Sequence, residues 1–141
     1  MAQQYQADLA VAEARSYIGV KWRHRARSRF SIDCLGLVVA AVQAGGVAMR
    51  DRVDYGRSPW KDGLEREFRE HFGDPIPFED AMPGDIALLC WDSRQGVPAH
   101  VGVLSDGKHG LQIIHSYSCS AVAEHGIDDK WRARILMVFR P

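Results

Sequence analysis

The sequence has no surplus of charge of either sign and no long apolar run. Its 141 residues carry 18 Lys and Arg against 18 Asp and Glu, so the formal net charge is zero. A chain without a net positive field is a poor match for a phosphate backbone, and we expect no nucleic-acid partner. No stretch approaches the roughly 20 apolar residues of a membrane-spanning helix, so we also expect no transmembrane segment.

The N-terminal residues also lack the features of an export signal. Residues 1–6 read Met-Ala-Gln-Gln-Tyr-Gln, with neither the basic nor the apolar region of a Sec-type signal peptide. We therefore expect synthesis in the cytoplasm without a signal peptide. Any action outside the cytoplasm would then depend on another carrier.

Cysteine is scarce, which excludes two further protein classes. The three cysteines are Cys34, Cys90 and Cys119, and no pair has the Cys-x-x-Cys spacing. An odd number of widely spaced cysteines does not make a disulfide framework or a zinc ribbon. Cys90 lies within an apolar run and is expected to be a small buried side chain, and Cys119 is expected to be structural or incidental.

The composition and pattern that remain predict a globular α+β protein with one domain over residues 1–141. Hydrophobic residues make up 46% and charged residues 26% of the chain. Apolar periodicity and capping residues predict helices over 9–18, from the N-cap Asp33 to about 44, and over 60–72 after the cap Ser58-Pro59. From residue 83 the pattern changes to short strands, predicted over 86–91, 100–104, 111–116, 121–124 and 135–140, with a helical turn near 128–131. Helices followed by an antiparallel meander indicate one layer packed on the other.

Cys34 is the residue with the strongest chemical signal. It follows Asp33 at the first turn of a predicted helix, where free N–H groups and the helix dipole favour a thiolate. His100 begins one predicted strand and His115 lies near the end of the next, and an antiparallel hairpin can place them side by side. His100 would then accept the Cys34 proton, and His115 would hold the His100 ring in the required tautomer. Taken singly, each histidine is more commonly structural than catalytic.

Several motifs in order resemble the NlpC-type cell-wall peptidases, a papain-like cysteine family. The matching segments are Ile18-Gly19-Val20-Lys21-Trp22, Asp33-Cys34-Leu35-Gly36-Leu37-Val38, Pro83-Gly84-Asp85-Ile86, His100-Val101-Gly102-Val103 and Ile114-His115. The resemblance implies a papain-like fold, with N-terminal helices packed on a C-terminal antiparallel sheet and the nucleophile at a helix N-terminus. It implies Cys34 as nucleophile, His100 as base and His115 as the orienting residue. The implied substrate is a peptidoglycan stem peptide, cut between D-glutamate and the diamino acid, with no cofactor and no metal.

The neighbourhood of these motifs supplies candidate substrate-binding residues, namely Trp22, Arg23, His24, Asp33 and Leu35. Arg23 and His24 belong to a basic loop that also contains Lys21, Arg25, Arg27 and Arg29, and its cations would attract substrate carboxylates. For most of these side chains a solvated loop is the simpler interpretation. Two residues depart from the family pattern: Leu35 stands where serine is usual, and Trp22 where tyrosine is common. An indole N–H donates a hydrogen bond but neither accepts one nor ionises.

The closing segment, from Ala123-Glu124-His125 through Trp131 to Pro141, resembles the branch of this family found in phages and gene transfer agents. That branch acts from the tail tip, so the resemblance implies tail-tip partner proteins and incorporation into such a tail. Two alternatives remain open from the residues. One is a catalytically inactive tail-tip component with the same fold, to which the departures at Trp22 and Leu35 point. The other is a zinc site formed by Cys34, His100 and His115.

Overall fold

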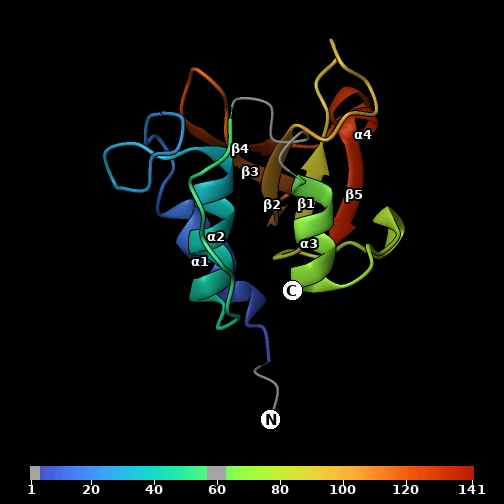
Figure 1. The fold of residues 1–141 in the computed structure, drawn as a ribbon. Coiled ribbons are helices and arrows are strands. Elements are labelled where there is room, and N and C mark those ends of the chain that lie inside the picture. The colour runs from blue at the N-terminus through green and yellow to red at the C-terminus, as the bar shows by residue number, and fades with distance from the viewer. Residues whose placement is uncertain (1–3, 57–62) are drawn as a thin grey trace.

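Helices precede a five-stranded antiparallel sheet in the computed structural model, which describes residues 4–56 and 63–141 (Figure 1). The elements are α1 (Ala7–Arg15), α2 (Cys34–Ala44), α3 (Leu64–Phe72), a 3-10 turn η2 (Phe78–Asp80), β1 (Ile86–Leu89), β2 (His100–Gly107), β3 (Gly110–Ser116), β4 (Val122–Gly126), α4 (Asp129–Arg134) and β5 (Ile135–Phe139). The strand order is β4-β3-β2-β1-β5, and neighbouring strands are antiparallel. The predicted α+β architecture is confirmed.

Helix α2 is the centre of the core, and its limits follow from its sequence. The Asp33 carboxylate accepts a hydrogen bond from the Gly36 N–H at 2.8 Å, which caps the first turn. The helix ends at Ala44, and Gly46 takes the left-handed φ of +90° that glycine adopts without strain. Its predicted inward residues are all fully buried: Leu37, Val38, Ala41 and Val42.

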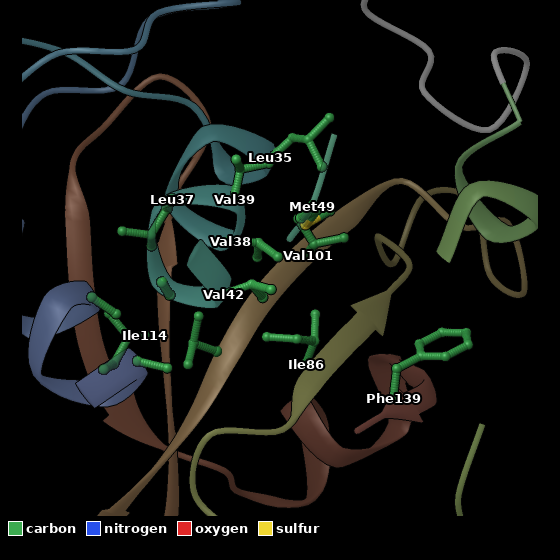
Figure 2. Packing of buried hydrophobic residues seen from close by; sticks show 14 of the residues in the cluster. Leu35, Leu37, Val38, Val39, Val42, Met49, Ile86, Val101, Ile114 and Phe139 are labelled. Carbon is green, nitrogen blue, oxygen red and sulfur yellow. The ribbon is translucent and has the colours of Figure 1, made fainter. Parts of the chain in front are cut away.

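The sheet is buried on both faces because successive side chains of each strand point to opposite sides. On one face Ile86, Val101 and Ile114 pack against α2 and its neighbours (Figure 2). On the other face Leu89, Leu104 and other strand residues meet the segment before β1 and the α4 region. Burial on both sides explains why β1 is apolar throughout rather than alternating.

Two sequence predictions differ from the structure in their limits, and a third lies partly outside the described residues. Helix α1 ends at Arg15 and is followed by a turn, so Leu9 and Ile18, expected on its buried face, are 44% and 48% exposed. Residues 105–107, expected to turn, continue β2, and the hairpin reverses at positions 108–109 with Gly107 opposite Gly110. The predicted cap Ser58-Pro59 and the start of the 60–72 helix lie outside the described residues, and α3 is described from Leu64.

Both outer strands of the sheet are paired by irregular segments. Beside β4, the Gly19 and Trp22 N–H groups donate to the carbonyls of Val122 and Ser120, each at 2.9 Å. Beside β5, the Ile76 N–H donates to Val138 at 2.8 Å. The first of these contacts anchors the loop that carries Trp22 against the sheet. In the part of the chain that the structure describes, no helix is long and apolar enough to cross a bilayer.

Candidate active site

A cavity of about 110 Å³ lies where the start of α2 meets the start of β2. Its lining comes from the start of α2 with the loops before and after it, from the start of β2 with the β1–β2 loop, and from the β3–β4 loop. The lining residues are Trp22, His24, Asp33, Cys34, Tyr55, Gly56, Trp91, Ala99, His100 and Ser118. Cys34 and His100 are therefore brought to one site from positions 66 residues apart in the sequence. We call this space the Cys34 cavity.

Cys34 is the first residue of α2 and is half-buried at the cavity. The main-chain N–H groups of Leu35 and Val101 donate toward its sulfur and favour the thiolate. Burial of the thiol and the adjacent Asp33 carboxylate act in the opposite direction and dominate, raising the pKa of Cys34 to about 12. Burial and the Asp33 carboxylate therefore oppose the thiolate that the helix start favours.

His100 and His115 form a direct hydrogen bond. The Nε2 atom of His100 lies 2.8 Å from Nδ1 of His115, and both side chains are buried. Burial, with the neighbouring charges of His115 and Arg134, holds the pKa of His100 well below its usual range. Burial, with the charges of His125 and Arg134, lowers the pKa of His115 to about 3. Both imidazoles are therefore neutral near pH 7, and His100 retains a basic lone pair.

Aromatic rings hold these two histidines in place. The Trp91 ring lies against His100 with centroids 4.6 Å apart and planes 30° apart. Trp131 packs against His115 at 5.1 Å, and Tyr117 contacts both Trp91 and His115. This surround excludes water from the histidine pair and accounts for the burial that depresses both pKa values.

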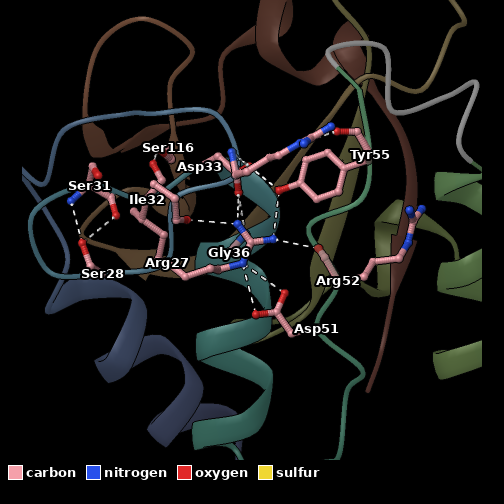
Figure 3. A network of polar contacts seen from close by, with 12 residues as sticks. Arg27, Ser28, Ser31, Ile32, Asp33, Gly36, Asp51, Arg52, Tyr55 and Ser116 are labelled. Atoms are coloured by element: carbon pink, nitrogen blue, oxygen red, sulfur yellow. Dashed lines mark hydrogen bonds and ion pairs between the residues drawn. The ribbon is translucent and has the colours of Figure 1, made fainter.

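Asp33 joins the segments that frame the cavity (Figure 3). Besides capping α2, its carboxylate accepts from Nη1 of Arg27 and from the Arg25 N–H, each at 2.8 Å, and from the Tyr55 hydroxyl. Arg27 lies against Gly36, where a β-carbon would stand 2.8 Å from its Cδ, so this position of the nucleophile motif has room only for glycine. The Asp33 oxygens are thus directed at the protein, although the residue lines the cavity.

The other predicted substrate-binding residues separate into two groups. Trp22 and His24 line the Cys34 cavity, and the His24 ring lies 5.6 Å from that of Tyr55. Arg23 is exposed and is not among the described residues that line the cavity, and the Leu35 side chain is buried in the core.

Three arginines of the basic loop have partners within the protein. Arg25 donates to the Tyr55 carbonyl at 2.7 Å, Arg27 pairs with Asp33, and Arg29 pairs with Glu13 at 2.9 Å. Their cations hold the loop in position, so for Arg27, which is 19% exposed, the interpretation as a solvated loop residue is wrong.

The arrangement does not favour the zinc alternative. His100 Nε2 and His115 Nδ1 face each other across a hydrogen bond, so these two nitrogens are not directed at a shared ion. Among residues 4–56 and 63–141, no group of three His, Cys, Asp or Glu side chains is placed to hold a metal.

Sequence reasoning missed four residues at or behind the cavity: Tyr55, Trp91, Ser118 and His125. His125 lies on β4, with its Nε2 2.8 Å from Nε2 of His115. The available signal was its position in the predicted strand region that follows His115, but its contact depends on the pairing of β3 with β4. The other three lie in loops or at their ends, where no periodicity marks a site.

Comparison with solved structures finds the same arrangement of elements elsewhere. NlpC1 from Trichomonas vaginalis superposes over 99% of this chain with a TM-score of 0.71 and 20% identity. An NlpC/P60 family protein from Bacillus cereus ATCC 10987 covers 95% of the chain, with a TM-score of 0.70 and 18% identity. The NlpC/p60 domain of the peptidoglycan hydrolase SagA covers 96%, with a TM-score of 0.63 and 21% identity. The chain has the NlpC/P60 fold.

The NlpC/P60 fold was the one that the motifs of the sequence implied, and this expectation is confirmed. No protein-family model and no curated protein sequence matches the chain. The chain spans 45% of the length of the Trichomonas protein and 39% of the Bacillus protein, but 98% of the SagA domain. The shared region is therefore less than half of the Trichomonas and Bacillus chains and nearly all of the SagA domain.

Proposed function

We propose that this protein is a cysteine peptidase that hydrolyses the stem peptides of peptidoglycan. The observation that carries the proposal is the placement of the Cys34 thiol and the His100 imidazole on one cavity, with His115 bonded to the far nitrogen of His100. The NlpC/P60 fold supports it, because one neighbour with this fold is described as a peptidoglycan hydrolase.

The proposed reaction uses the Cys34 sulfur as nucleophile and the His100 imidazole as base and acid. Sulfur of Cys34 attacks the carbonyl carbon of the substrate amide while its proton passes to Nδ1 of His100. The Leu35 N–H, at the start of α2, stabilises the oxyanion of the tetrahedral intermediate. The carbon–nitrogen bond then breaks as His100 protonates the leaving amine, which leaves a thioester on Cys34. Water attacks the thioester, giving a proton to His100, and that proton returns to sulfur as the acid departs.

Two further parts of the proposal are the bond that is cleaved and the assembly from which the protein acts. We propose the D-glutamyl–diamino acid bond as the target, with Trp22 and His24 contacting the peptide in the cavity and Arg23 attracting substrate carboxylates from outside it. We also propose that the protein acts from a phage-like or gene-transfer-agent tail, on the resemblance of its C-terminal segment to that branch. Tail-tip proteins would then be its partners.

Mass spectrometry of released muropeptides tests the proposal. Purified wild-type protein is incubated with peptidoglycan alongside Cys34→Ala and the matched control Cys119→Ser, which changes an exposed thiol outside the cavity lining. We expect release of cleaved stem peptides by the wild type and the control, and none by Cys34→Ala. The released termini identify the bond.

Two results would count against the proposal. Undiminished release by Cys34→Ala would remove Cys34 as nucleophile. No release by folded wild-type protein would favour the inactive tail-tip component.

A further inference from the structure

Three histidines form a continuous hydrogen-bonded chain across β2, β3 and β4. His100 Nε2 lies 2.8 Å from His115 Nδ1, and His115 Nε2 lies 2.8 Å from His125 Nε2. The chain ends where Nδ1 of His125 lies 2.8 Å from the carbonyl oxygen of Gly126. Every link therefore joins two ring nitrogens, except the last, which joins a ring nitrogen to a carbonyl.

An orienting histidine alone does not determine the tautomer of its neighbour. A neutral imidazole has one donor and one acceptor nitrogen, and either nitrogen can carry the proton. His115 could therefore present Nδ1 to His100 as a donor or as an acceptor. If Nδ1 donated, the Nε2 atom of His100 would have to accept, and the His100 proton would occupy Nδ1, leaving no lone pair there for the thiol.

The carbonyl at the end of the chain removes this ambiguity. The Gly126 oxygen can only accept, so Nδ1 of His125 carries the proton and its Nε2 accepts when the ring is neutral. Nε2 of His115 must then donate, and its Nδ1 must accept from Nε2–H of His100. The remaining nitrogen, Nδ1 of His100, is left with its lone pair.

Packing keeps the chain in this geometry. The centre of the Trp131 ring lies 4.6 Å from that of His125 and 5.1 Å from that of His115. One indole therefore packs against both of the histidines that lie beyond His100. The guanidinium of Arg134 stands 4.5 Å from the Trp131 ring centre and forms an ion pair with Asp92 at 2.7 Å. The charge of Arg134 lowers the pKa of His100 and of His115, which opposes a positive charge on these rings.

We propose that His125 is a positioning residue that, together with the Gly126 carbonyl, sets the tautomers of His115 and His100 so that His100 presents an unprotonated Nδ1 to Cys34. The part of this inference that concerns Cys34 rests on the proposed peptidase function. The part that concerns the tautomers rests only on the hydrogen-bonded chain, and the two can be tested separately.

Long-range proton–nitrogen NMR of protein labelled with nitrogen-15 at histidine reads each tautomer directly. In the wild type near neutral pH we expect the proton on Nε2 in His100 and His115 and on Nδ1 in His125. His125→Phe keeps a ring beside Trp131 but removes the acceptor, and we expect His115 to lose its single tautomer. His125→Gln offers an amide oxygen in its place and should restore the wild-type tautomers. The control His109→Phe changes an exposed histidine of the hairpin turn. It should leave the tautomers of His100, His115 and His125 as they are in the wild type.

Peptidoglycan hydrolysis gives the second readout. We expect His125→Phe to reduce the rate about tenfold, which is the lower end of the loss when the hydrogen-bond partner of a metal-ligating histidine is removed. His125→Gln should recover most of that loss.

Either of two spectra would overturn the proposal: a proton on Nδ1 of His100 in the wild type, or an unchanged His115 tautomer in His125→Phe. The wild-type spectrum tests the proposed tautomers by itself, even if a variant does not fold. A wild type with the expected tautomers but no hydrolysis would contradict the proposed function and leave the tautomer assignment standing.

Discussion

Replacing Asp33 by alanine should destabilise the protein far more than removal of an ordinary helix cap. The substitution removes the cap of α2, which costs about 1 kcal/mol of unfolding free energy. It also removes one of the two carboxylate partners of Arg27, in an ion pair whose side chains are only 19% and 4% exposed, while Asp51 stays 3.0 Å from Nε of Arg27. Losing a hydrogen bond to a charged group costs about 1.5–3 kcal/mol, so we expect a total of about 2.5–4 kcal/mol.

A second N-cap in the same chain supplies the matched control. Asp128 caps α4 through one exposed hydrogen bond, from the Trp131 N–H at 2.9 Å. Among the described residues it forms no ion pair with a buried arginine, unlike Asp33 with Arg27. Asp128→Ala should cost about 1 kcal/mol. Asp33→Asn keeps an oxygen for the Gly36 N–H but loses the charge, and should fall between the two alanine variants.

Urea unfolding followed by far-ultraviolet circular dichroism measures these free energies of unfolding. Thermal melting ranks the variants independently by Tm. For a domain of this size, about 1 kcal/mol corresponds to roughly 2–4 °C in Tm. The three variants should therefore melt in the order Asp128→Ala, Asp33→Asn, Asp33→Ala, from highest to lowest. Equal losses for Asp33→Ala and Asp128→Ala, within 1 kcal/mol, would refute the view that Asp33 is a structural junction.

Two further predictions concern the buried histidines and Gly102 on β2, the strand that begins with His100. Because the pKa values of buried His100 and His115 lie below those of the unfolded chain, the unfolded state binds more protons, and the free energy of unfolding should fall as pH drops from about 6.5 to 5. The slope, measured by urea unfolding, is at most about 1.4 kcal/mol per pH unit for each histidine, and His115→Gln should reduce it; a flat profile would contradict the assignment. Gly102→Ala would place a β-carbon 2.8 Å from the Ile113 side chain and 3.1 Å from the Ile114 carbonyl oxygen. It should cost roughly 1–3 kcal/mol in the same assay, and wild-type stability would show that the strand yields without strain.

Much of the fold could be predicted from the sequence because its signals are local. Asp33 and the glycines after Ala44 mark the limits of α2, and apolar runs mark β1 and β5. The end of β2 could not be placed in this way, since Gly107 is a turn former by itself and a strand residue only through its pairing with Gly110. Its extended state depends on the partner strand rather than on its own preference.

The site was partly predictable for the same reason. The motifs locate Cys34, His100 and His115, but not the state of the thiol, because a helix N-terminus is a local feature and burial is not. Tyr55 reaches the cavity through its hydroxyl contacts with Asp33 and Arg27, which no spacing along the chain reveals. His125 likewise becomes relevant only once β4 lies beside β3.

The pairing of the Gly19–Trp22 segment with Ser120–Val122 also bears on solubility. An outer strand with unpaired main-chain groups is a template for adding strands from other molecules, and proteins commonly protect such strands with a covering loop. Here the covering segment for β4 carries Trp22, a wall of the Cys34 cavity. A substitution that released this segment would therefore open the cavity and expose a surface for self-association in the same event. The same few residues therefore cover the outer strand and close one side of the cavity.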